Sequence, residues 1–226
     1  MKITILTLFP EIFDGFFSTS IPLIAKEKGL LDVQVINFRD FTSDKHHKCD
    51  DEPYGGGAGM VLKPEPLFKA LKSIDALKKR VIYPSPAGKL FNQKIAFELS
   101  KEKEIVFIAG HYEGVDQRVI DAFVTDELSI GDYVLSSGET AILVMIDAIY
   151  RLIDGVINSE SLVEESFNDS LLEYPQYTRP AEYEGMRVPD VLLSGNHKQI
   201  NEWRYQKRLE KTIKNRIDLM SKNINR

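Results

Sequence analysis

The chain alternates short apolar runs with segments of helical periodicity, and this alternation restricts the fold more than any other feature of the sequence. The clearest run, residues 105–109, is apolar at every position, which is typical of a strand in a parallel sheet covered on both faces. Strands are also predicted over residues 3–9, 33–38, 81–83 and 124–130. Helices are predicted over residues 65–78, 93–101, 115–123 and 139–153. The pattern predicts an α/β fold with a mostly parallel sheet.

Prolines and a polar segment mark expected boundaries. Pro10 is expected to open a helical stretch, because the first helical turn tolerates proline. Pro84 and Pro86 are expected to end the strand over residues 81–83. Residues 40–60 are polar and rich in glycine, and we expect them to form a loop.

Glycine is concentrated in three segments of the chain: residues 53–60, within the expected loop, and residues 110–114 and 129–139. Glycine lets the backbone approach a ligand closely or adopt a positive φ. Two of these segments, together with residues 85–88, follow predicted strands, and ligands of open α/β sheets bind beyond the carboxyl ends of the strands. Any one segment alone is equally consistent with an ordinary turn. Together they indicate a binding site assembled from backbone.

Composition excludes several classes of protein. The 226 residues are 43% hydrophobic and 28% charged, as in a soluble globular protein. Cys49 is the single cysteine, which excludes an internal disulfide and fits a reducing cytosol, so we expect a cytoplasmic protein. The most apolar predicted helix, residues 141–153, carries Asp147 and Arg151 and is too short to span a bilayer, so no membrane association is expected.

Familiar nucleotide and metal motifs are missing from the sequence. No G-x-G-x-x-G follows the first predicted strand, which argues against a standard dinucleotide fold, and no G-x-x-x-x-G-K-[ST] is present. His46, His47 and Cys49 could indicate a metal ion, but no second cluster of ligands accompanies them. We therefore expect no metal site built from these residues.

Charge is distributed unevenly. Residues 197–226 contain nine cations and three anions, a net charge of +6, which leaves −11 for residues 1–196. Such a basic end indicates a polyanionic partner, with solubility as the alternative explanation. The strand and helix pattern stops after Gly155, so we expect a first domain over residues 1–157, a linker over 158–170 and a helical domain over 171–226. A helix over residues 198–220 is predicted to carry Leu209, Ile213 and Ile217 on one side.

Five segments occur in an order and at spacings that resemble one family. They are Pro-Tyr-Gly-Gly-Gly-Ala-Gly-Met at 53–60, Gly-His-Tyr-Glu-Gly at 110–114, Ser-Ile-Gly-Asp-Tyr-Val-Leu at 129–135, Tyr-Thr-Arg-Pro at 177–180 and Val-Leu-Leu-Ser-Gly-Asn-His at 191–197. The resemblance is to bacterial tRNA (guanine-N1)-methyltransferases of the SPOUT superfamily. It extends from Leu8 to the region of Trp203, nearly the whole chain.

The resemblance implies a deep trefoil knot in the first domain, an exception to the rule against knots. It also implies a homodimer with a shared active site, S-adenosylmethionine as cofactor, tRNA as partner and a dependence on Mg²⁺. The residues that it implies for cofactor binding are Tyr83, Ser85, Pro86, Gly110, Tyr112, Glu113, Ser129, Ile130, Gly131, Asp132, Tyr133, Val134, Leu135 and Gly138.

The implied reaction needs an acid–base group and a cation. N1 of guanine carries a proton at neutral pH, so a base must remove it, and negative charge then builds on O6. By resemblance the cation is Arg151, although a cation at a helix C-terminus is also favoured by the helix dipole. The base is Glu165, where the family usually has aspartate, with Asp169 as the alternative. Both acids could instead belong to a solvated linker.

The resemblance also implies contacts to the RNA. Gly59 and Glu113 would border the target base, and Arg204, Lys207 and Lys211 would contact tRNA phosphates. Ser137 stands where the family favours glycine, so the loop there is expected to be stiffer or to adopt a different φ.

The predicted function is S-adenosylmethionine-dependent methylation of N1 of the guanosine immediately 3′ of the tRNA anticodon. Two alternatives stay open. One is a knotted RNA methyltransferase with another target nucleoside. The other is a catalytically inactive RNA-binding protein of the same fold. This alternative stays open because Glu165 replaces the aspartate that the family usually has.

Overall fold

The computed structural model describes residues 1–158, 165–167 and 169–221. Its chain divides into two compact units, Met1–Ile157 and Asn158–Arg226. Within the described residues, no helix combines the length and the apolar character needed to cross a membrane.

A five-stranded parallel sheet organises the first unit. Its strands are β1 (Lys2–Thr7), β2 (Asp32–Asn37), β5 (Arg80–Leu90), β6 (Glu104–Ile108) and β7 (Asp126–Ser129). They lie in the order β2-β1-β6-β5-β7. Every pairing is parallel, and Ile3 lies opposite both Val33 and Ile105. The carboxyl ends of all five strands therefore meet at one edge, which confirms the mostly parallel α/β sheet predicted from the sequence.

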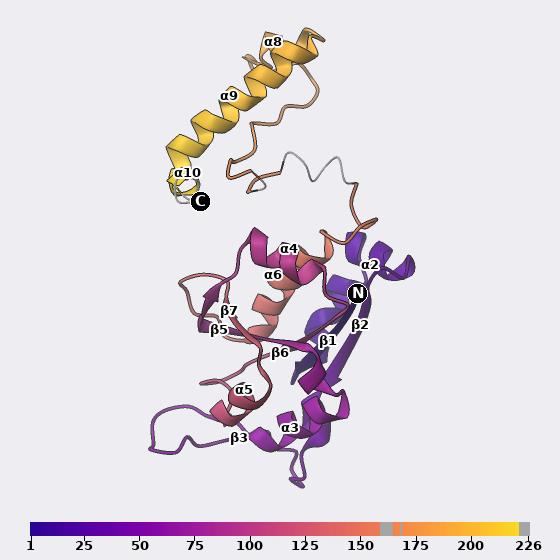
Figure 1. Ribbon diagram of the computed structural model, residues 1–226, viewed down its shortest axis with the longest axis vertical. Helices are drawn as coiled ribbons and strands as arrows, with labels where there is room; N and C mark the ends of the chain where they lie inside the picture. Colours follow the sequence, from indigo (N-terminus) through magenta and orange to yellow (C-terminus); the bar gives the residue numbers. More distant parts are fainter. Residues whose placement is uncertain (159–164, 168, 222–226) are drawn as a thin grey trace. The chain divides into compact units, whose positions relative to one another are not determined.

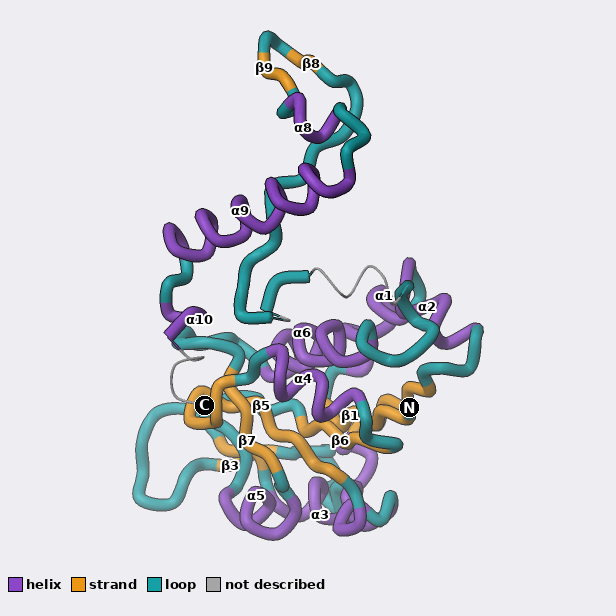
Figure 2. The backbone as a smooth tube through the Cα atoms, turned by 45° about the horizontal axis from the view of Figure 1, so that its top comes forward, coloured by secondary structure: helices purple, strands orange, loops and turns teal. Residues whose placement is uncertain are grey.

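Helices cover both faces of this sheet (Figures 1 and 2). On one face α4 (Gln93–Ser100) and α6 (Gly138–Tyr150) pack with α1 (Asp14–Phe17) and α2 (Ser20–Glu27) against a core that includes Ile3, Ile5 and Phe107. On the other face α3 (Pro64–Ser73) and α5 (Gln117–Phe123) cover Leu6, Val106 and Ile108. Side chains alternate between the two faces of a strand, so an apolar strand supplies both cores.

The helix boundaries follow from local chemistry. The side-chain oxygens of Asn92 and Asp116 accept hydrogen bonds from backbone N–H groups in the first turns of α4 and α5, a common way to start a helix. Helix α3 ends at Ser73, earlier than predicted, because Asp75 adopts a left-handed conformation (φ 52°) before a short 3₁₀ helix at Ala76–Lys78. A 3₁₀ helix at Pro10–Phe13 precedes α1, as the proline suggests.

Strand β5 contradicts the prediction that Pro84 and Pro86 end it. The strand runs to Leu90, with Pro84 opposite Leu128 and a shift of register before Lys89 also faces Leu128. Pairing with β6 covers Arg80 to Ile82 alone, so the prolines lie beyond that ladder. A proline costs little where its missing N–H has no ladder partner to lose.

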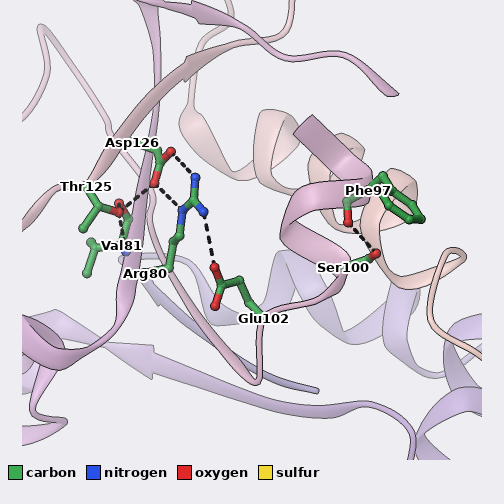
Figure 3. A network of polar contacts seen from close by, with 7 residues as sticks. All are labelled: Arg80, Val81, Phe97, Ser100, Glu102, Thr125 and Asp126. Atoms are coloured by element: carbon green, nitrogen blue, oxygen red, sulfur yellow. Dashed lines mark hydrogen bonds and ion pairs between the residues drawn. The ribbon is translucent and has the colours of Figure 1, made fainter. Parts of the chain in front are cut away.

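A polar bracket holds the opposite, amino-terminal edge of the sheet (Figure 3). The guanidinium of Arg80 donates two hydrogen bonds of 2.7 Å to the carboxylate of Asp126 and one of 3.2 Å to Glu102. The hydroxyl of Thr125 donates to the same aspartate at 2.7 Å. These hydrogen bonds, those of Arg80 first, hold the pKa of Asp126 below its usual value. The bracket joins β5 and β7 far from their carboxyl ends.

Two short ribbons complete the strands: β3 (Asp50–Asp51) with β4 (Val61–Leu62) in the first unit, and β8 (Glu182–Tyr183) with β9 (Met186–Arg187) in the second. The second unit also contains the helices α8 (Asp190–Leu193), α9 (His197–Asn215) and α10 (Asp218–Ser221). Of the predicted linker, residues 159–164 and 168 lie outside the described residues.

The prediction that Ile213 and Ile217 lie on a packed apolar side of helix α9 is wrong. The helix ends at Asn215, and Ile213 and Ile217 are 54% and 65% exposed. The packed position is instead Thr212, which is fully buried and accepts a hydrogen bond of 2.9 Å from the backbone N–H of Leu172. Polar contacts therefore hold this helix, and apolar spacing alone pointed to the wrong side.

Candidate active site

A cavity of about 260 Å³ opens in the first unit, where β5, β6 and β7 end, and we name it the loop pocket. Its lining comes from β5 and from the loops that follow β6 and β7. The lining residues are Tyr83, Pro84, Ser85, Pro86, Gly110, His111, Tyr112, Glu113, Gly114, Leu128, Ser129, Ile130, Gly131, Tyr133, Val134, Leu135, Ser136, Ser137, Gly138 and Ala141. They include every residue expected to bind the cofactor except Asp132, which lies outside the lining.

Tyr83 forms a buried part of this lining. It is 7% exposed, and burial raises the pKa of its phenol. A Cβ placed on Gly110 would lie 3.0 Å from the Tyr83 ring, so the close approach of loop and ring depends on glycine there. The neutral phenol and the bare backbone give this part of the pocket a flat surface without charge.

Gly138 allows two loops to touch. Its N–H donates a hydrogen bond of 2.8 Å to the carbonyl of Gly110, and a Cβ on Gly138 would lie 2.7 Å from the Gly110 nitrogen. The neighbouring Ser137 has a φ of −159°, an extended conformation open to any residue. A larger residue at 138 would therefore meet the backbone of Gly110. Of the two effects expected from serine at 137, the φ is one that serine adopts without strain, and a stiffer loop stays a prediction.

Short hydrogen bonds shape the loop after β7. The Ser129 hydroxyl donates to the carbonyl of Gly131 at 3.1 Å and accepts from its N–H at 3.3 Å. The phenol of Tyr133 donates to the carbonyl of Ile130 at 3.1 Å. Val134 is 86% exposed, so an apolar side chain stands in solvent at the rim of the pocket. Such an arrangement leaves apolar surface for a ligand to cover.

The first glycine-rich segment lies against the loop after β6. The N–H of Glu113 donates to the carbonyl of Met60 at 3.0 Å, and the N–H of Leu62 donates to the carbonyl of Gly114 at 2.9 Å. Gly59 has a φ of +91°, and a Cβ there would lie 2.6 Å from Cγ of Glu113. The two residues expected to border the target base are thus adjacent.

Glu139 is a buried acid beside the pocket that the sequence did not indicate as a site residue. Glu139, in the first turn of α6, is 1% exposed and accepts a hydrogen bond of 2.6 Å from the hydroxyl of Thr7 at the end of β1. Its other oxygen, Oε2, lacks a hydrogen-bond partner among the described residues. Thr7 and Glu139 are 132 positions apart, so no local pattern indicates their hydrogen bond. The sequence shows only that an acidic residue lies at the N-terminus of a predicted helix, where the helix dipole favours it.

Arg151 caps the C-terminus of α6 and is partly exposed. At the preceding residue, the phenol of Tyr150 donates to Asp147 at 2.9 Å. Burial and then this aspartate raise the pKa of Tyr150, and the positive charge of Arg151 acts in the opposite direction. Arg151 lies outside the lining of the loop pocket, at the far end of the helix that Gly138 begins.

The two candidate bases belong to the second unit and differ in their surroundings. Asp169 accepts hydrogen bonds from the Arg208 guanidinium and, at 3.3 Å, from the N–H of Leu171. Arg208 is 12% exposed and also donates to the carbonyl of Leu172 at 3.3 Å. Asp169 therefore holds the chain against α9, and Glu165 is half-buried.

The three cations expected to meet RNA lie on α9 in different settings. The Arg204 guanidinium stacks 4.7 Å from the ring centre of Tyr174. Lys207 pairs with Glu210 at 2.6 Å, and Lys211 is exposed. Within the described part of the chain, no three His, Cys, Asp or Glu side chains gather as a metal site.

Comparison with known proteins adds independent information. A family model described as tRNA (guanine-1)-methyltransferase TrmD matches residues 1–222. A tRNA (guanine-N(1)-)-methyltransferase of Treponema denticola is 60% identical over 222 residues, covering 98% of this chain and 91% of the relative. Proteins of the same name from Borrelia turicatae and Macrococcus caseolyticus are each 57% identical, covering 98% and 97% of this chain and 94% and 92% of their own lengths.

The match covers every feature described above, from the end of β1 through the loop pocket to α9, and it agrees with the five segments that the sequence presents in order. The chain belongs to the tRNA (guanine-1)-methyltransferase family.

Proposed function

We propose that this protein transfers the methyl group of S-adenosylmethionine to N1 of the guanosine immediately 3′ of the anticodon in tRNA. The observation that carries the proposal is the loop pocket, because two of the segments on which the resemblance rests, residues 110–114 and 129–135, line it in a chain that matches the family over residues 1–222. The pocket lies at the carboxyl edge of a parallel sheet, where such folds bind ligands.

The loop pocket suits an adenosine-containing cofactor. Backbone from β5 and from the loops after β6 and β7 surrounds it, and Leu135 and the buried Tyr83 add apolar surface. Pockets with apolar walls and a few polar groups from the backbone are typical of cofactor sites. When bound, S-adenosylmethionine supplies a methyl group on a positively charged sulfur, ready for attack by a nucleophile. The residues predicted to hold it are those named from the resemblance, with Asp132 as the weakest candidate.

The protein's own residues prepare the guanine. Glu165 is proposed to accept the proton of N1, which frees a lone pair for attack. Arg151 is proposed to stabilise the negative charge that develops on O6, where a positioned cation has its largest effect in the transition state. Asp169, the alternative base, pairs with Arg208. Gly59 and Glu113 are proposed to border the target base, which their contact makes possible.

The second unit is proposed to bind tRNA through α9. Lys211 is exposed. Lys207 pairs with Glu210 within the protein, and Arg204 stacks on Tyr174. Phosphate contacts of this kind depend strongly on salt and carry no sequence information. The domain roles follow: residues 1–157 for the cofactor, 158–170 as linker and 171–226 for tRNA.

We also propose the trefoil knot, a homodimer with a shared active site and a cytoplasmic location, all of which the family implies. Exposed apolar side chains in the first unit, among them Ile12, Ile24 and Val144, offer contacts for a second copy. No step is assigned to Mg²⁺, because the described residues do not gather a set of metal ligands.

The homodimer can be tested by mixing two inactive variants. If Arg151 and Glu165 of different copies meet in one site, a mixture of Arg151→Ala and Glu165→Gln chains, unfolded and refolded together, should regain turnover that neither has alone. Mixing without any gain would contradict a shared site. Refolded wild-type protein is the control.

The function itself is tested by methyl transfer from labelled S-adenosylmethionine to unmodified tRNA. One substrate carries guanosine 3′ of the anticodon and the other adenosine. Label on the guanosine substrate alone is the expected result. Label on both would indicate a methyltransferase with another target, and tRNA binding without label on either would indicate an inactive RNA-binding protein.

A further inference from the structure

The second unit contains a cavity of its own, of about 400 Å³, which we name the aromatic groove. The segment around Tyr174, Tyr177 and Arg179 forms one side, and Leu192 and Arg204 contribute from α8 and α9. Figures 1 and 2 show this segment running beside α9. The volume falls within the range of small-molecule sites. The proposed function assigns this groove no role beyond the phosphate contact of Arg204.

Aromatic rings and a guanidinium give the groove its chemistry. The guanidinium of Arg204 stacks on the Tyr174 ring, which is 9% exposed, and so adds a flat cationic surface to the lining. Tyr177 is 49% exposed, and its ring centre lies 6.3 Å from that of Trp203. An exposed ring backed by a second aromatic residue is a surface on which a nucleobase can stack.

Charge identifies the class of ligand. The sequence of residues 158–226 has eleven cations and eleven anions, so the unit as a whole is neutral. The described lining of the groove departs from this balance, because it contains Arg179 and Arg204 and no acidic side chain. Helix α9, which includes Arg204, carries six cations against two anions. Positive charge is therefore concentrated around an aromatic cavity, as expected for single-stranded nucleic acid.

We propose that the aromatic groove takes one unstacked nucleobase of the tRNA, stacked on Tyr177, with the flanking phosphates held by Arg179 and Arg204. The proposal rests on the proposed function for the identity of the RNA. The base is not the methylated guanosine, because the N1 of that guanosine must reach the methyl donor in the loop pocket of a first unit. The groove thus contributes a second point of recognition.

The first test removes the ring of Tyr177 in the full-length protein. Tyr177→Leu should weaken binding of unmodified tRNA by about 5- to 100-fold, the usual effect of losing one stacked base. Tyr177→Phe keeps the ring and should bind like the wild type. Tyr205→Leu is the matched control, since Tyr205 is 51% exposed on α9 and lies outside the groove. Equal losses from Tyr177→Leu and Tyr205→Leu would overturn the proposal.

The salt dependence separates stacking from charge. Tyr177→Leu removes no charge, so the slope of log affinity against log salt should stay as in the wild type. Lys211→Gln should lower that slope by about 1 if its ammonium contacts a phosphate. A reduced slope in Tyr177→Leu would indicate that the variant disturbs the phosphate contacts rather than a base, and would count against the proposal.

A series of tRNAs, each with one abasic nucleotide, identifies the base directly. One abasic position should weaken binding to the wild type and have little further effect on Tyr177→Leu, because the two changes remove the same contact. If every abasic position weakens both proteins equally, no base occupies the groove. A change in the oligomeric state of Tyr177→Leu would instead point to a second protein chain as the occupant, and would also overturn the proposal.

The outcome is distinguishable from failure of the proposed function. Methylation by the wild type reports on the function alone, whereas the abasic series reports on binding. A wild type that binds tRNA through the groove without methylating it would refute the activity and leave the groove assignment intact.

Discussion

The two units build their cavities in opposite ways. The loop pocket is made from backbone, and the sheet behind it is buried on both faces. The aromatic groove is made from side chains, and the apolar core behind it is small: among described residues of the second unit, the buried apolar ones are Leu171, Tyr174 and Leu219. A cofactor of fixed shape suits the first design, and a flexible polyanion suits the second.

The same contrast appears in what holds each unit together. Glycines such as Gly138 let loops of the first unit pack backbone against backbone. In the second unit, hydrogen bonds of Arg208 and Thr212 to the chain near Leu172 secure α9. Regions with few buried apolar contacts open at lower free energy than packed cores. Substitutions should therefore act through steric conflict in the first unit and through lost polar contacts in the second.

The largest expected effect comes from the carboxylate that the second unit is proposed to supply. Glu165→Gln keeps the size of the side chain and removes the base, so turnover should fall by about 10²- to 10⁴-fold. Turnover at saturating tRNA and cofactor is the measurement. Asp169→Asn is the comparison, and its effect should be much smaller because Asp169 is engaged with Arg208. Full activity in Glu165→Gln with loss in Asp169→Asn would reverse the assignment.

The second-largest effect is expected from Arg151, the cation that the first unit is proposed to supply. Arg151→Ala should lower turnover by about 10²- to 10³-fold, because it removes the charge that is proposed to face O6 in the transition state. Cofactor affinity, measured by calorimetry, should stay near that of the wild type, since Arg151 lies outside the lining of the loop pocket. An equal loss of both quantities would show that Arg151 supports the pocket instead.

Gly138→Ala tests whether the loop pocket depends on backbone contact. The new Cβ would lie 2.7 Å from the Gly110 nitrogen, and such overpacking typically costs about 1–3 kcal/mol. Cofactor affinity should fall with it, because both loops line the pocket. Ser137→Ala, at the neighbouring extended residue, should leave the melting temperature and the affinity nearly unchanged. If both variants behave alike, contact between the loops does not shape the pocket.

The smallest effect is expected on the free energy of unfolding, when two ion pairs of similar geometry are removed in turn. Arg80→Gln should cost about 1–2 kcal/mol, because Arg80 and Asp126 are 31% and 18% exposed. Arg216→Gln should cost less, since Arg216 and Asp218 are 43% and 53% exposed and surface pairs contribute little. Urea unfolding followed by circular dichroism measures both. Equal costs would remove burial as the distinguishing factor.

The pair at Asp126 also has a pH signature. Arg80 lowers the pKa of Asp126 in the folded protein below its unfolded value. The stabilisation is therefore complete above the unfolded pKa, near 4, and is lost as the pH falls through the folded pKa. Below about pH 4 the difference in stability between wild type and Arg80→Gln should shrink. A difference independent of pH would mean that the pair contributes through packing alone.

Sequence alone predicted the sheet and its helices well, because an apolar run such as residues 105–109 has few alternatives to a buried strand. It failed at β5, where the cost of a proline depends on which neighbouring strand is present. It failed again on α9, where Thr212 rather than Ile213 packs inward. Both errors concern tertiary partners that no local pattern encodes.

The loop pocket was predictable in part. Glycine spacing and the resemblance to the family indicated its loops, because close backbone approach leaves a trace in the sequence. The hydrogen bond between Thr7 and Glu139 left none, since it joins residues 132 positions apart. The ion pair of Asp169 with Arg208 likewise left no trace, since it joins residues 39 positions apart, and the choice of Glu165 over Asp169 stays a prediction from the resemblance.

The most direct test is to identify the product. Unmodified tRNA is treated with the protein and S-adenosylmethionine, digested to nucleosides and analysed by mass spectrometry against authentic methylated guanosines. The expected product is 1-methylguanosine, formed at the position 3′ of the anticodon and absent from the Glu165→Gln reaction. Methylation at another atom of guanine, or at another position of the tRNA, would contradict the proposed reaction.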